Sequence, residues 1–236
     1  MRYELYYWTA IQGRGEYVRL ALEDAGADYI DVAREHGDNV ILPFLRGKQE
    51  GAMPFAPPFL KAGRLVIAQT ATILAYLGPR LGLVPEGQSA ELHAQQLQLT
   101  IADFVVEIHD THHPIAASQY YEGQRATARK RAEVFRDERL LKFLAYFEQV
   151  IERGNGRQAL SRHSYVDLSL FQLISGLDYA FPNAMQRVNK RIPRLRALAE
   201  RVAERPNIAA YLASPRRIPF NEEGIFRHYA ELDPAR

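Results

Sequence analysis

The hydrophobic pattern of this 236-residue chain changes once, near residue 82, and that change constrains its fold more than any other feature. Before it, short aromatic or β-branched runs alternate with segments of helical period. Residues 3–8 and 29–33 predict strands, and residues 14–25 between them predict a helix that ends at Gly26. This β-α-β order is typical of a parallel crossover unit.

The rest of the first 82 residues continues the mixed pattern. A polar stretch without clear period, residues 34–51, precedes a turn-rich run at 53–58. Two short apolar runs then flank residues 61–64, which predicts a hairpin. Residues 70–81 carry apolar side chains at helical spacing. We therefore predict a small α/β domain over residues 1–82.

Beyond a polar linker at residues 83–89, the pattern is helical almost throughout. Helices are expected at residues 90–119, 126–153, 165–177, 193–204 and 208–213, followed by a tail with little regular pattern. The predicted second domain, residues 90–236, is accordingly all-helical. An α/β domain followed by an all-α domain is the fold class that the sequence indicates.

Composition excludes several kinds of function. The chain has no cysteine, so it has no disulfide, zinc–thiolate site or cysteine nucleophile of its own. Its net charge of +2, with basic and acidic residues interleaved, argues against nucleic-acid binding. The sequence has no run of 18 apolar residues, so no membrane span is predicted. The first five residues lack an export-signal pattern. We expect a cytoplasmic protein without nucleic-acid or membrane partners.

Four short motifs could carry function or folding information. Tyr6-Tyr7-Trp8 ends the first predicted strand, at the sheet edge where ligands bind in α/β proteins. Pro57-Pro58 precedes the next strand, where a cis turn would leave backbone groups for a peptide ligand. Gln69-Thr70 begins a predicted helix, with Thr70 as its capping residue and free N–H groups for a carboxylate. Ser164 and Asp167 form a capping-box pattern before a buried helix.

In this order and spacing the four motifs resemble the glutathione transferase family over nearly the whole chain. Tyr7-Trp8, followed by Gly13-Arg14 and a helix, is similar to the tyrosine-type classes, mu- and sigma-like or a related bacterial class. Pro58-Phe59-Leu60 resembles the family's cis-proline motif, and nine residues separate Leu60 from Gln69. The resemblance implies a thioredoxin-like domain joined to a helical domain, and a homodimer.

The resemblance also implies a detoxifying enzyme that adds the thiolate of glutathione, its co-substrate, to hydrophobic electrophiles. Tyr7 would be the catalytic residue, because its O–H would donate to the sulfur and favour the thiolate. The residues implied to bind glutathione are Arg14, Lys48, Pro57, Pro58, Gln69 and Thr70. Those implied for the electrophile are Trp8, Ile11, Ile108 and His112, with Trp8 packing between the domains.

Several alternatives remain open on the sequence alone. Tyr6 instead of Tyr7 could face the sulfur, because neighbouring strand residues point to opposite faces. Either Pro57 or Pro58 could follow the cis bond, although the spacing to Gln69 favours Pro58. The same fold could serve a non-catalytic glutathione- or ligand-binding protein, or a glutathione-dependent isomerase or peroxidase. The physiological electrophile is not readable from the sequence.

A histidine-rich stretch, residues 109–113, raises the question of a metal. His109 and His113 are four residues apart, which is a spacing that metal sites on helices use. No HExxH pattern or third-ligand motif accompanies them. The prediction from the sequence is therefore that no metal binds there and that these histidines are exposed or line the cleft.

Overall fold

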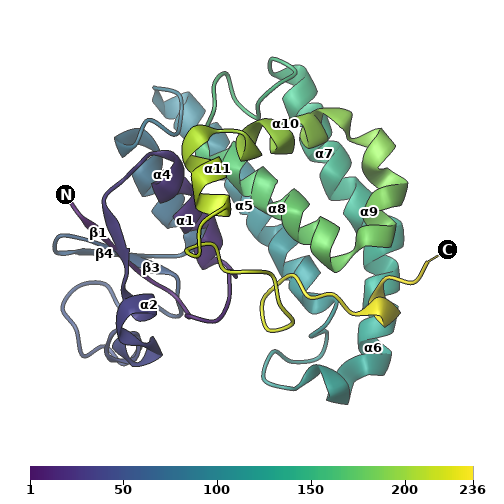
Figure 1. Ribbon diagram of the computed structural model, residues 1–236, viewed down its shortest axis with the longest axis horizontal. Helices are drawn as coiled ribbons and strands as arrows, with labels where there is room; N and C mark the ends of the chain where they lie inside the picture. The colour runs from purple at the N-terminus through teal and green to yellow at the C-terminus, as the bar shows by residue number, and fades with distance from the viewer. Residues whose placement is uncertain (236) are drawn as a thin grey trace.

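The computed structural model describes residues 1–235, and its N-terminal part contains a sheet with the strand order β2-β1-β3-β4 (Figure 1). The strands are β1 (Tyr3–Tyr6), β2 (Tyr29–Asp31), β3 (Phe59–Ala62) and β4 (Leu65–Ala68). β1 pairs parallel to β2 and antiparallel to β3, which forms the predicted hairpin with β4. The mixed sheet agrees with the predicted α/β domain.

Side chains of alternate strand residues supply two separate clusters on the faces of the sheet. Leu5 and Leu60 face α1 (Gly15–Asp24) and α4 (Thr70–Arg80). Tyr6 and Phe59 face α2 (Val32–His36), a 3-10 turn at Asp38–Val40 and α3 (Leu42–Leu45). The predicted strand at 29–33 is too long, because its last two residues begin α2. The stretch 34–51, expected to be irregular, also contains short helices.

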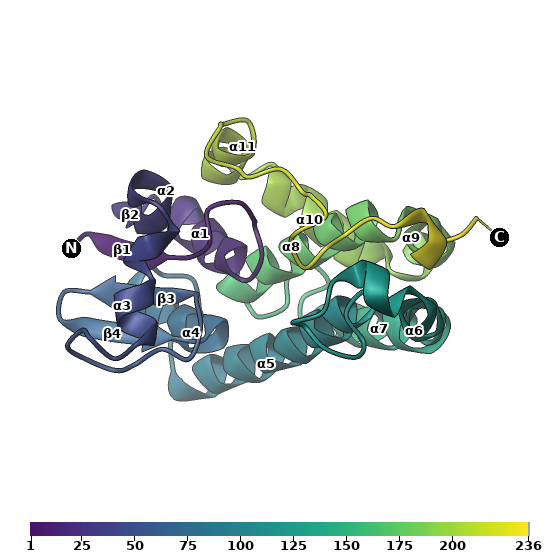
Figure 2. The same ribbon diagram turned by 90° about the horizontal axis from the view of Figure 1, so that it is seen from below.

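The C-terminal part is helical (Figure 2). Its helices are α5 (Gln88–Asp110), α6 (Tyr121–Val134), a π-helical turn at Phe135–Arg139, α7 (Leu140–Arg153), α8 (Tyr165–Ala180), α9 (Pro182–Val188), α10 (Pro193–Ala203) and α11 (Pro206–Leu212), with 3-10 turns at Asn189–Arg191 and Ala230–Leu232. The predicted helix at 90–119 was placed wrongly at both ends: α5 begins within the expected linker and stops at Asp110. The predicted helix at 126–153 is interrupted by the π turn.

A continuous core joins the two parts of the chain. Tyr17, Leu20 and Ala21 of α1 pack with buried residues of α5 and α8 in a single cluster. Beyond α11, the chain runs back across the helices toward α6 and α9 (Figure 1). This C-terminal segment, residues 217–232, also contributes Ile225, Phe226 and Leu232 to the core. It is therefore part of the packed structure.

The capping box predicted at the start of α8 is confirmed. Asp167 accepts the backbone N–H of Ser164 at 2.7 Å, and the Ser164 side chain accepts the backbone N–H of Asp167. Asp167 also accepts the backbone N–H of Ala159 at 2.8 Å. The motif satisfies backbone donors that the helix start would otherwise leave unpaired inside the protein. None of the helices in the described residues is long and apolar enough to cross a membrane.

Candidate functional site

The register of the sheet brings three of the sequence motifs to one edge. Tyr6 pairs with Phe59, and Phe59 pairs with Ala68. The residues just beyond these three positions, Tyr7, Pro58 and Gln69, therefore leave the sheet side by side. The peptide bond between Pro57 and Pro58 is cis, as the motif spacing favoured.

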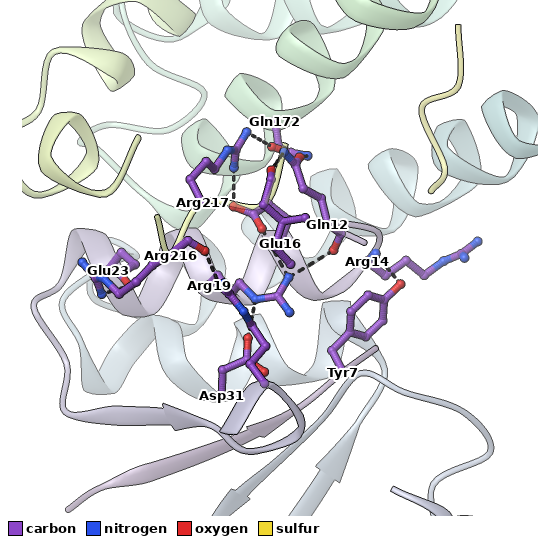
Figure 3. A network of polar contacts seen from close by, with 12 residues as sticks. Tyr7, Gln12, Arg14, Glu16, Arg19, Glu23, Asp31, Gln172, Arg216 and Arg217 are labelled. Carbon is purple, nitrogen blue, oxygen red and sulfur yellow. Dashed lines mark hydrogen bonds and ion pairs between the residues drawn. The ribbon is translucent and has the colours of Figure 1, made fainter. Parts of the chain in front are cut away.

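Tyr7 lies beneath the loop that leads into α1 (Figure 3). The backbone N–H of Arg14 donates to the Tyr7 hydroxyl at 2.9 Å, and Tyr7 is only 4% exposed. A Cβ atom at Gly13 would lie 2.1 Å from the Tyr7 hydroxyl oxygen, and one at Gly15 would lie 2.5 Å from its Cγ. The two glycines thus allow the loop to pass closely over the ring.

Tyr6 lies on the opposite face of the sheet, away from this loop. Its ring stacks on Phe59 with centroids 4.6 Å apart and contacts Phe44 at 5.0 Å. Its hydroxyl donates to Glu4 at 2.8 Å. Tyr6 is therefore a core residue, and Tyr7 is the tyrosine beside the loop and the cis peptide bond.

The Tyr7 hydroxyl keeps its proton at neutral pH. Burial raises the pKa of Tyr7, and the backbone N–H groups of Arg14 and Gly15, with the charges of Arg14 and Arg19, offset only part of that rise. The Arg19 guanidinium carbon lies 5.7 Å from the centroid of the Tyr7 ring. A protonated phenol whose oxygen already accepts a backbone hydrogen bond can still donate its own O–H.

A buried ion-pair network lies behind Tyr7 (Figure 3). Arg19, which is 1% exposed, donates through Nε to Asp31 at 2.7 Å and through Nη1 to Glu16 at 3.3 Å. Glu16 is fully buried and accepts a hydrogen bond from the Tyr211 hydroxyl at 2.7 Å. It also forms an ion pair with Arg217. The network links α1 to β2, α11 and the C-terminal segment.

The same network fixes the start of the loop over Tyr7. Arg19 donates to the backbone carbonyl of Gln12 at 3.3 Å. The Gln12 side chain accepts from Gln172 of α8 at 2.8 Å and donates to the backbone carbonyl of Ile218. Arg217, which also pairs with Glu16, donates a hydrogen bond to Gln172 at 3.0 Å. The position of the Arg14 N–H thus depends on contacts with the helical part of the chain.

Gln69 and Thr70 stand at the start of α4, but not in the roles expected for a helix cap. Gln69 occupies the N-cap position with a left-handed φ of 69°, and Thr70 is the first helical residue. The prediction that Thr70 caps the helix was therefore wrong. Its hydroxyl donates instead to the backbone carbonyl of Arg14 at 3.4 Å, which ties α4 to the loop over Tyr7.

The sequence is similar to a known family model and to known proteins. A family model described as "Glutathione S-transferase, C-terminal domain" matches residues 109–215. A glutathione S-transferase of Plasmodium yoelii yoelii is 24% identical over 86% of this chain and 90% of its own length. "Glutathione S-transferase P 10" of Caenorhabditis elegans is 28% identical over 89% of this chain and 90% of its own. These similarities support the cytosolic glutathione transferase family for this chain.

Solved structures of this family share the fold. The pi-class glutathione S-transferase of Onchocerca volvulus superposes with a TM-score of 0.73 at 22% identity, covering 95% of this chain and 99% of that one. A structure named prostaglandin synthase D, from Nilaparvata lugens, gives a TM-score of 0.71 at 20% identity, covering 93% of this chain and all of that one. A thioredoxin-like domain joined to a helical domain is thus the fold of this chain.

The residues expected to bind glutathione lie around Tyr7 to different degrees. Pro57 and Pro58 stand beside it on the sheet edge, and Gln69 is exposed at the start of α4. Arg14 is half-buried, and its side chain extends away from the Tyr7 ring (Figure 3). Lys48 is exposed in the loop after α3, ten residues before Pro58 in the sequence. Its role stays a prediction.

Two of the residues expected to line the electrophile site lie in the core of the protein. Ile108 is fully buried and His112 is 1% exposed. His112 forms a hydrogen bond with the carbonyl of Ile225 in the C-terminal segment. Periodicity placed Ile108 on the helix correctly, but His112 lies in the turn beyond the end of α5 at Asp110, where the C-terminal segment covers it. The expectation that the histidines of this stretch are exposed or line a cleft is wrong for His112.

Trp8 and Ile11 lie in different surroundings. Trp8 packs against the cluster that contains Tyr6 and Phe44, so the expectation that it packs between the domains was wrong. Ile11 is half-buried, and its Cβ would lie 4.0 Å from a Cβ placed at Gly224. Ile11 is thus the one of the four that borders both the Tyr7 loop and the C-terminal segment.

Sequence reasoning missed the ion-pair network of Glu16, Arg19 and Asp31. Every residue of α1 is buried, including its charged ones, so the helix has no polar stripe facing solvent. No local signal could have found it, because Glu16, Arg19 and Glu23 recur at i, i+3 and i+7, the pattern of an ordinary solvent-facing stripe.

Proposed function

We propose that the protein is a glutathione transferase in which Tyr7 stabilises the thiolate of bound glutathione for attack on hydrophobic electrophiles. One observation carries the proposal. The Tyr7 oxygen accepts the backbone N–H of Arg14, while its own O–H has no acceptor among residues 1–235. The hydroxyl is thus oriented and protonated, with its proton available to a ligand at the sheet edge.

The chemistry follows from the pKa of a thiol. A free thiol has a pKa near 8.5, so only a few per cent is ionised at neutral pH. A hydrogen bond to an ionised partner contributes about 1.5–3 kcal/mol, which corresponds to roughly one to two pKa units. Donation from Tyr7 would therefore place much of the bound thiol in its nucleophilic form.

The surroundings of Tyr7 suit a tripeptide with two carboxylates. The first turn of α4, after Gln69, offers backbone N–H groups that are unpaired within the helix and attract a carboxylate. The Pro57 carbonyl at the cis bond can accept a backbone N–H, although Pro57 has none to donate. Arg14 and Lys48 supply positive charge for the carboxylates, and Gln69 and Thr70 supply polar side chains.

Access for the electrophile requires movement of the C-terminal segment. A cavity of about 10 Å³ lies between Gln12, Gly13 and the residues around Phe220 and Phe226. That is room for about one water molecule. Asn221 closes it further by donating to the carbonyl of Ala10 at 2.8 Å. We infer that residues 219–226 shift when an electrophile binds near Ile11.

The test compares Tyr7→Phe with Tyr6→Phe in conjugation assays on aromatic halides and unsaturated carbonyls. Tyr7→Phe should reduce kcat/KM by roughly 10- to 100-fold, the loss of one hydrogen bond to a charged partner. Tyr6→Phe, which loses only a contact with Glu4, should retain activity. Equal activity of Tyr7→Phe and the wild type would contradict the role of Tyr7.

The wild type distinguishes the alternative functions. Glutathione binding without turnover would favour a non-catalytic binding protein. Turnover only of peroxides or of isomerisable substrates would favour a peroxidase or an isomerase.

We also propose a homodimer. Phe55, before the cis bond, is 92% exposed, and Leu92, Leu99 and Val106 form an exposed apolar stripe at seven-residue intervals along α5. Apolar side chains grouped in this way typically mark an interface. Sedimentation should show twice the 26.9 kDa chain mass, and Phe55→Ser with Leu99→Glu should shift it to the monomer. A wild type that sediments only as the monomer at micromolar concentration would contradict the dimer.

A further inference from the structure

Three histidines, one in the last turn of α5 and two just beyond its end, gather around one point inside the protein. His109, His112 and His113 each offer a ring nitrogen, and these nitrogens all lie within 4.8 Å of one another. The three rings have centroids 4.8 to 5.1 Å apart. His112 and His113 are buried, and His109 is half-buried. The cluster is separate from the groups assigned above to glutathione.

The orientation of His112 is fixed by the C-terminal segment. Its Nε2 lies 2.8 Å from the carbonyl oxygen of Ile225, and a carbonyl can only accept, so Nε2 carries a proton. In a ring that carries its single proton on Nε2, the Nδ1 atom has a free lone pair. A backbone carbonyl that orients a histidine in this way is the usual outer partner of a metal ligand.

The Nδ1 lone pair of His112 points at a second nitrogen. Nδ1 of His113 lies 2.5 Å away, and without a metal it must donate its proton to His112. A metal ion between them would replace this proton bridge, while the His113 proton would move to Nε2 of the same ring. No net proton is lost, because both rings remain neutral. The pair is thus arranged as two converging ligand atoms.

Charges near the cluster oppose each other. The Arg227 guanidinium lowers the pKa of all three histidines, and Arg14 lowers that of His109. Glu122 acts in the opposite direction on His113. The guanidinium of Arg227 is held by the backbone carbonyls of Glu223 and Gly224, at 2.9 and 2.8 Å. We expect Arg227 to weaken cation binding without occupying the ring nitrogens.

We propose that His109, His112 and His113 bind one divalent transition-metal ion of the Zn²⁺ class. Imidazole nitrogens suit Zn²⁺, Cu²⁺ and Ni²⁺, and three protein ligands leave a fourth position for water. At metal–nitrogen distances of about 2.0–2.1 Å, tetrahedral ligand atoms lie roughly 3.4 Å apart. The present spacings of 2.5 Å to at most 4.8 Å bracket that value. This proposal departs from the expectation drawn from the sequence and does not depend on the proposed transferase function.

An entry route exists on the outer side of His113. A cavity of about 580 Å³ is lined by His113, Glu122, Glu222, Glu223 and Arg227 among others. The three carboxylates attract cations to its mouth, which offsets part of the repulsion from Arg227. The ion would reach the cluster from this side, away from Tyr7.

The test is equilibrium dialysis of the full-length protein against Zn²⁺, with Co²⁺ absorption as a measure of coordination geometry. The wild type should bind one ion per chain, with Co²⁺ bands typical of a tetrahedral site. His109→Ala and His113→Ala should each weaken binding by at least about 10- to 100-fold, the loss that removal of even an outer partner causes. The matched control, His36→Ala with His93→Ala, removes two exposed histidines and should leave binding unchanged.

Folding is monitored separately by circular dichroism, because His112→Ala alone could unfold the buried cluster. Bound Zn²⁺ should raise the melting temperature of the wild type and of the control, but not of the folded His113→Ala variant. Absence of Zn²⁺ binding by the wild type would overturn the proposal. Undiminished binding by His109→Ala and His113→Ala, or its loss in the control, would overturn it as well.

Discussion

The backbone N–H of Arg14 donates a hydrogen bond of 2.9 Å to the phenol oxygen of Tyr7. This bond defines the orientation of the hydroxyl without using its proton. It joins the end of β1 to the loop before α1, and Thr70 of α4 holds the Arg14 carbonyl from the other side. Three elements of the thioredoxin-like domain thus meet at the group to which we assign thiolate stabilisation.

Replacing Gly13 with Ala should disturb Tyr7 more than it disturbs folding. The new Cβ would lie 2.1 Å from the Tyr7 hydroxyl oxygen, and the φ of 45° is costly for any residue with a Cβ. We expect a loss of about 1–2 kcal/mol in the free energy of unfolding, together with a fall in kcat/KM of roughly 10-fold or more. Urea unfolding and steady-state kinetics measure the two effects.

Gly63→Ala is the matched control for this prediction. Gly63 has a φ of 65° in the hairpin turn, and a Cβ there would approach no atom closer than 4.0 Å. The stability loss should be similar, while kcat/KM should not change. A comparable decline in kcat/KM for both variants would show that the effect of Gly13→Ala is not specific to Tyr7.

Replacing Arg19 with Met should destabilise the whole protein. Its loss leaves the partly buried Asp31 carboxylate without its 2.7 Å partner, while Glu16 keeps Tyr211 and Arg217. Breaking a buried pair on one side costs about 3–5 kcal/mol, which urea unfolding would measure. Arg2→Met is the control, because Arg2 and Asp28 form an exposed pair at 3.5 Å that should contribute less than about 1 kcal/mol. Similar losses for both variants would argue against the network as a major source of stability.

The stability that Asp24 provides should depend on pH. Burial alone would raise the pKa of Asp24, but hydrogen bonds and charge from His163 and Arg205 lower it overall. A carboxyl with a lowered folded-state pKa stabilises the fold above its unfolded pKa, near 3.9, and loses this contribution as the pH falls through the folded-state value. Asp24→Asn should therefore reduce the free energy of unfolding at pH 7 by about 1–3 kcal/mol.

The difference between Asp24→Asn and the wild type should shrink as the pH is lowered below about 4, because a protonated Asp24 resembles asparagine. Urea unfolding at pH 7 and at successive values below 4 gives the comparison. A difference that stays constant over this range would mean that the charge of Asp24 does not stabilise the fold. Asp24 joins α1 to residues before α8 and α11, so the effect reports on contact between the two parts of the chain.

The local patterns of the sequence predicted much of the fold. The alternating residues of β1, the hairpin around residues 61–64 and the capping box at Ser164 depend on neighbours in sequence, so periodicity and spacing reveal them. The Pro57–Pro58 turn was also favoured correctly, from its distance to Gln69. Short-range chemistry decides all of these features.

Features that depend on distant contacts were not predictable in this way. Gln69 adopts a left-handed backbone at the helix start, although its residue type gives no sign of it. His112 was expected on a helix face, but α5 ends at Asp110, and a hydrogen bond joins His112 to Ile225, more than a hundred residues away. The buried Arg19 is stabilised by its helix neighbour Glu16 and by Asp31 of β2, and only the tertiary structure identifies the second partner.

The most direct measurement of the central claim is a pH titration of the thiol of bound glutathione. Thiolate absorbance is followed in the ultraviolet for complexes of the wild type, Tyr7→Phe and Tyr6→Phe. We predict that the thiol pKa lies about one to two units below 8.5 on the wild type and on Tyr6→Phe, and returns toward 8.5 on Tyr7→Phe. An unchanged thiol pKa in the Tyr7→Phe complex would contradict the assignment of Tyr7.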